Sequence, residues 1–121
     1  GAALAASCDI RVGCEKTSFR FVSSHGRVGA IWSLPQLVGW PMAKELLLTA
    51  REVDSVDSKE AYRLGLLNHL VASDQIMLKA IELARYIEAN DPKTEARVKE
   101  LLNKGLAKQL AEMRSNERRP Q

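Results

Sequence analysis

The sequence predicts an α/β protein in which short strands and helices alternate at first and only helices follow. Two observations support this. Short apolar stretches punctuated by glycine and proline fill the first 72 residues, whereas from residue 76 the apolar residues recur every three or four positions. The 121 residues, 45% hydrophobic and 27% charged, suffice for one modest core. We therefore expect an α/β part over residues 1–72 and a helical region over residues 73–121.

The first elements follow from local composition. They are a helix at 2–7, strands at 9–13 and 18–22, a loop at 23–29, and a helix at 30–38 that is interrupted near Pro35. The helix at 2–7 is alanine-rich. Both strands are predicted from the alternation of apolar residues. It places Ile10 and Val12 on the inner side of the strand at 9–13, and Phe19 and Phe21 on the inner side of the strand at 18–22.

Capping and turn residues define the next elements, which are a helix at 41–49, a strand at 51–54, a helix at 57–64 and a strand at 68–71. Gly39 separates the first of these helices from the chain before it, and Pro41 is favourable at its first position. Asp57 is a good N-cap for the second helix, and Gly65 supplies its C-terminal stop.

Beyond residue 72 the pattern is purely helical. Ile76, Ala80, Leu83 and Ile87 fall on one helical face. Asn90 or Asp91 is expected to cap the next helix, with Pro92 at its start. An apolar stripe then continues along that helix at Val98, Leu101, Leu102, Leu106, Leu110 and Met113.

The charge pattern excludes some classes of partner. The net charge is only +3, and the arginines at 114, 118 and 119 are interleaved with Glu112 and Glu117. A solvated helix face explains this better than a nucleic-acid surface, and the aromatic content of 5% argues against base stacking. We therefore expect no nucleic-acid partner.

Cysteine usage and hydropathy bear on compartment and metal binding. Cys8 and Cys14 are the two cysteines, without a CxxC or a Cys/His pair, so no metal site is expected. No apolar run reaches membrane-spanning length, and nothing resembles a signal peptide or a C-terminal peroxisomal tripeptide. We expect a cytoplasmic protein with no membrane span.

Two segments resemble the crotonase superfamily, the enoyl-CoA hydratase/isomerase family. GAALAASCDIR at residues 1–11 is similar to the family's glycine-rich turn, its E-L-A-L-A helix and its C-D-I-R strand start. Residues 34–71 match the family's LPRLVG, ELLLTGR, D/S-x-x-E-A, GL and V-N-x-V-V pattern. The resemblance covers roughly residues 1–113. It implies the second half of the family's ββα spiral followed by C-terminal helices, with the N-terminal half absent and the last helices shortened.

The resemblance implies a chemistry on acyl-CoA thioesters, in which two backbone N–H groups stabilise the thioester oxygen as it gains enolate charge. Gly1 aligns with the last glycine of the family's Gly-Gly-Gly turn, so the donor residue would precede it, and Gly1 and Ala2 would border the substrate. Hydratases add two glutamates as general acid and base. Their positions here hold Ala3 and Ser23, and residues 17–44 contain no Asp or Glu. Neither alanine nor serine replaces a carboxylate as a base near neutral pH.

Other residues of this region have both a functional and a structural interpretation. His25 is the titratable substitute nearest to Ser23, or a solvent-exposed loop histidine. Val22, Ser23 and Trp32 would approach the acyl group, although Trp32 is also a natural core residue. Arg27 could meet a CoA phosphate, or be a solvated loop arginine.

The resemblance thus implies an enzyme that takes coenzyme A as part of its substrate and needs no separate cofactor, and that assembles as a trimer or a dimer of trimers. The 121-residue chain by itself is expected to be inactive. The alternatives are a non-catalytic relative that acts as a binding or assembly subunit and, more remotely, an unrelated small α/β domain.

Overall fold

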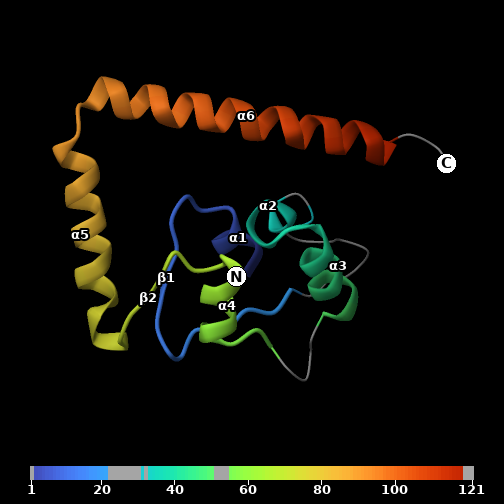
Figure 1. Cartoon of the computed structure of the whole chain (residues 1–121), viewed down its shortest axis with the longest axis horizontal. Coiled ribbons are helices and arrows are strands. Elements are labelled where there is room, and N and C mark those ends of the chain that lie inside the picture. Colours follow the sequence, from blue (N-terminus) through green and yellow to red (C-terminus); the bar gives the residue numbers. More distant parts are fainter. Residues whose placement is uncertain (1, 22–30, 32, 51–54, 119–121) are drawn as a thin grey trace. The chain divides into compact units, whose positions relative to one another are not determined.

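The computed structural model describes residues 2–21, 31, 33–50 and 55–118 (Figure 1). It divides into two compact units, residues 1–80 and 81–121. The elements, in order, are α1 (Ala2–Ala6), β1 (Val12–Gly13), α2 (Leu34–Val38), α3 (Trp40–Thr49), α4 (Ser58–Leu64), β2 (His69–Leu70), a short 3-10 helix (Ser73–Gln75), α5 (Ile76–Ala89) and α6 (Pro92–Arg118). The predicted α/β class is confirmed, with short mixed elements first and helices after them.

A small parallel sheet joins distant parts of the first unit. β1 pairs with β2, with Val12 opposite His69 and Gly13 opposite Leu70. An antiparallel bridge adds Phe19 and Val56, whose backbone N–H groups each donate to the other's carbonyl at 2.9 Å. The pairing brings residues 12–19 against residues 56–70, so the sheet depends on contacts between distant positions.

The predicted inner side of the strand at 9–13 is wrong. Ile10 is 44% exposed, whereas Arg11 is 9% exposed and Gly13 is buried. Two local demands reverse the pattern. The Arg11 guanidinium donates to the Leu66 carbonyl, and at Gly13 a Cβ atom would lie 2.8 Å from the Leu67 side chain, so a larger residue would force that side chain to move. The inward prediction for Phe19 and Phe21 is confirmed, since both are buried and their rings stack with centroids 6.2 Å apart.

Helices α2 and α3 follow the predicted punctuation with one change. Pro35 lies in the first turn of α2 and starts that helix instead of interrupting it. Gly39, at a φ of 84°, ends α2 and precedes α3. The predicted loop at 23–29 and the predicted strand at 51–54 lie outside the described residues.

Helix α4 has the predicted boundaries. The Asp57 carboxylate accepts a hydrogen bond from the Glu60 backbone N–H at 2.8 Å, which is an N-cap. Gly65 ends the helix with a φ of 92°, in the left-handed region that favours glycine.

The core of the first unit lies among the strands and the short helices. Its largest fully buried side chains are Leu34, Leu46, Leu66 and Val56. Leu34 begins α2, Leu46 lies in α3 and Leu66 follows α4, so α2, α3 and the segment after α4 each bury a large side chain. This packing fixes the α1–β1 region that borders the candidate site.

The second unit contains the end of α5 and the whole of α6, one continuous helix in Figure 1. Asp91 caps α6, as one of the two predicted alternatives: it accepts hydrogen bonds from the Thr94 hydroxyl at 2.7 Å and the Thr94 N–H at 3.2 Å. Within the described parts of the chain, no helix combines the length and apolarity needed to cross a membrane.

Candidate functional site

Helix α1 is built to pack closely. Its sequence AALAA has high helix propensity and small side chains, and Ala6 reaches the core at 4% exposure. Leu4, by contrast, is 73% exposed. The helix ends where the N–H of Ser7 donates to the Leu4 carbonyl and the N–H of Cys8 donates to the Ala5 carbonyl, both at 3.1 Å. α1 therefore rests on the core by its alanine face.

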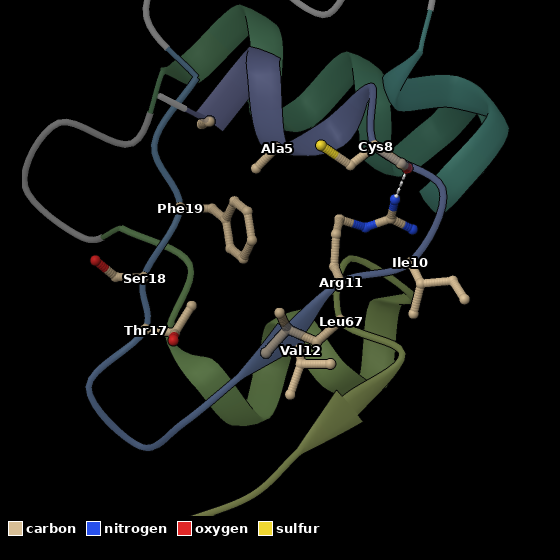
Figure 2. Close-up of a pocket in the computed structure, with 10 residues that line it drawn as sticks. Ala5, Cys8, Ile10, Arg11, Val12, Thr17, Ser18, Phe19 and Leu67 are labelled. Carbon is tan, nitrogen blue, oxygen red and sulfur yellow. Dashed lines mark hydrogen bonds between the residues drawn. The ribbon is translucent and has the colours of Figure 1, made fainter. Parts of the chain in front are cut away.

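Arg11 ties the end of α1 to the connection between α4 and β2. Its Nε donates to the Leu66 carbonyl at 2.6 Å and its Nη1 donates to the Cys8 carbonyl at 2.5 Å (Figure 2). Its backbone N–H donates to the Asn68 side chain at 2.8 Å, and its carbonyl accepts from the N–H of Asn68 at 2.8 Å. Sequence reasoning missed this role. The available signal was an arginine between Ile10 and Val12, in a strand whose alternation predicted those two residues on the inner side.

An open cavity of about 500 Å³ lies beside α1 and β1. Ala2 and Ala5 of α1, residues 8 and 10–12 at the junction and in β1, residues 17–19 and Leu67 line it. Figure 2 shows Ala5 and Phe19 directed into this space and the Arg11 guanidinium reaching toward Cys8. Within the described part of this lining, Arg11 carries the one charged side chain.

Few of the predicted site residues fall in the described structure. Ala2 lines the cavity, and Ala3 lies in the first turn of α1. The other predicted site residues, Gly1, Val22, Ser23, His25 and Trp32, lie outside the described residues, as does Arg27. Their role at a common site stays a prediction.

The described residues offer no acid–base pair at this cavity. Among the described residues that line it there is neither a carboxylate nor a histidine, and His69 is half-buried in β2. No group of three or more His, Cys, Asp or Glu side chains among residues 2–21, 33–50 and 55–118 is placed to hold a metal ion. The described residues thus form a mainly apolar recess to which Arg11 contributes a buried cation.

Comparison with known proteins identifies the class. The family model described as enoyl-CoA hydratase/isomerase matches residues 1–121. The chain belongs to this family, the crotonase family, as its sequence resemblance indicated.

Individual relatives show how much of the family fold is present. A putative enoyl-CoA hydratase/isomerase of Bacillus subtilis, YngF, is 36% identical over 115 residues, which are 92% of this chain and 43% of that protein. The short-chain-enoyl-CoA hydratase of Clostridium acetobutylicum is 32% identical over 119 residues, covering 88% of this chain and 43% of that protein. The chain thus spans less than half the length of these relatives.

Solved structures agree with the sequence relatives. A monofunctional enoyl-CoA isomerase from M. smegmatis superposes with a TM-score of 0.78 at 29% identity, over 88% of this chain and 50% of that one. An enoyl-CoA hydratase from Bacillus anthracis gives 0.78 at 30% identity, over 93% and 48%. The similar proteins include a hydratase and an isomerase, so likeness alone does not select one reaction.

Proposed function

We propose that this chain is part of an enoyl-CoA hydratase/isomerase that acts on acyl-CoA thioesters. The enzyme would stabilise a thioester enolate with backbone N–H groups beside α1. The family match over residues 1–121 is the observation that supports this. α1 begins at Ala2, directly after the glycine that aligns with the family's glycine turn. Coenzyme A enters as part of the substrate, and no separate cofactor is required.

The 121-residue chain alone is proposed to be inactive. The aligned oxyanion donors fall outside these residues, and loss of one such donor typically costs about 2.7–4 kcal/mol in the transition state. Ala3 and Ser23 occupy the positions of the family's two glutamates. Proton transfer by a positioned group typically raises the rate by about 10² to 10⁴. Loss of the oxyanion donors and loss of the two glutamates should therefore each lower activity severely.

A non-catalytic binding or assembly subunit is the alternative. Ala3 and Ser23 favour it, because neither supplies the carboxylate that a hydratase needs. The cavity lining within the described residues adds no replacement for that carboxylate. In both cases the quaternary state is proposed to be a trimer or a dimer of trimers.

Organisation and location complete the proposal. Residues 1–72 form the spiral part and residues 73–121 the helical region. The cytoplasm is the proposed compartment, because Cys8 and Cys14 are both free thiols, which suits a reducing environment.

The test is loss of the enoyl-thioester absorbance with a short enoyl-CoA. The Clostridium acetobutylicum hydratase serves as the positive control and boiled protein as the blank. We expect no turnover by the 121-residue chain, and none by its Ala3→Glu/Ser23→Glu variant, because acid–base groups act only on a bound, polarised thioester. Turnover by the unmodified chain would show that the catalytic groups lie elsewhere than at the aligned oxyanion donors and glutamate positions. If the protein assembled as a trimer or a dimer of trimers binds acyl-CoA but does not turn it over, the non-catalytic alternative is favoured.

A further inference from the structure

We draw no further inference here: the strongest candidate, the exposed apolar face of α6 that carries Val98, Leu101 and Leu102, supports no proposal, because nothing among the described residues shows what covers it.

Discussion

The helices of the two units are stabilised in different ways. In the first unit even five-residue helices persist, because α2 buries Leu34 completely and α1 buries Ala6. In the second unit α6 runs for 27 residues, yet its apolar residues Val98 and Leu102 are 51% and 69% exposed. Short helices depend on tertiary packing, whereas a long one can rely on caps and neighbouring side chains.

Local interactions are visible along α6. Asp91 caps its start, and Glu100 forms an ion pair with Lys104 at 2.9 Å, one turn along the helix. An exposed pair of this kind contributes only about 0.3–0.5 kcal/mol. The comparison therefore predicts large mutational effects in the first unit and small ones in the second.

The largest effect is expected from Leu46→Ala. The side chain is 2% exposed, and its removal leaves a cavity in the core, so the free energy of unfolding should fall by about 2–5 kcal/mol. Tryptophan fluorescence during urea unfolding measures it, because Trp32 and Trp40 both belong to the first unit. Leu48→Ala on the same helix is the control, with a change within about 0.5 kcal/mol. Equal effects of the two substitutions would contradict the core described here.

Gly65→Ala should destabilise the first unit by a smaller amount. Alanine at a φ of 92° costs about 1–2 kcal/mol. A Cβ atom there would also lie 2.9 Å from the Leu37 carbonyl oxygen, which cannot move without shifting the backbone. The same fluorescence measurement applies, and an unchanged urea midpoint would argue against the left-handed turn.

Gly105→Ala should have the opposite sign. Gly105 lies within α6, and a Cβ atom would meet no atom within 4 Å. Replacing a helical glycine by alanine should therefore stabilise α6 by about 0.5–1 kcal/mol. Far-ultraviolet circular dichroism during heating measures helix loss. A decrease in helicity would mean that this position has a packing requirement that the described structure does not show.

The smallest effect concerns pH. The hydrogen bond from the Thr94 hydroxyl, followed by that from its N–H, lowers the pKa of Asp91 below the usual value of about 3.9. Because the folded pKa is lowered, the cap is at full strength above about pH 3.9 and is lost as pH falls through the folded pKa. Carbon NMR of the carboxyl group should show this lowered pKa, and Thr94→Ala should raise it. An unchanged pKa of Asp91 in that variant would show that the Thr94 hydroxyl does not bind its carboxylate, which would contradict the cap at the start of α6.

Much of the architecture was predictable because its signals are local. Asp57 and Gly65 bracket α4, and Asp91 precedes α6, since capping and positive φ depend on a few adjacent residues. The family was also predictable, because residues 1–11 and 34–71 preserve recognisable patterns.

The candidate site was less accessible to sequence reasoning. Alternation predicted that Ile10 faces inward, yet Arg11 is the buried residue. Its partner Leu66 lies 55 positions away, and Gly13 lies close to the Leu67 side chain, which is almost as distant in the sequence. Such contacts leave no periodic signal in either segment.

The sequence by itself determined the class of the protein, the order of its helices and the ends of α4, because propensities, caps and turns act over a few residues. Only the tertiary structure decided which side of the strand at 9–13 is buried, how Arg11 holds α1 to the α4–β2 connection, and where the cavity opens. These depend on groups that are distant in the chain, and the free energy that places them arises only when both segments are packed together.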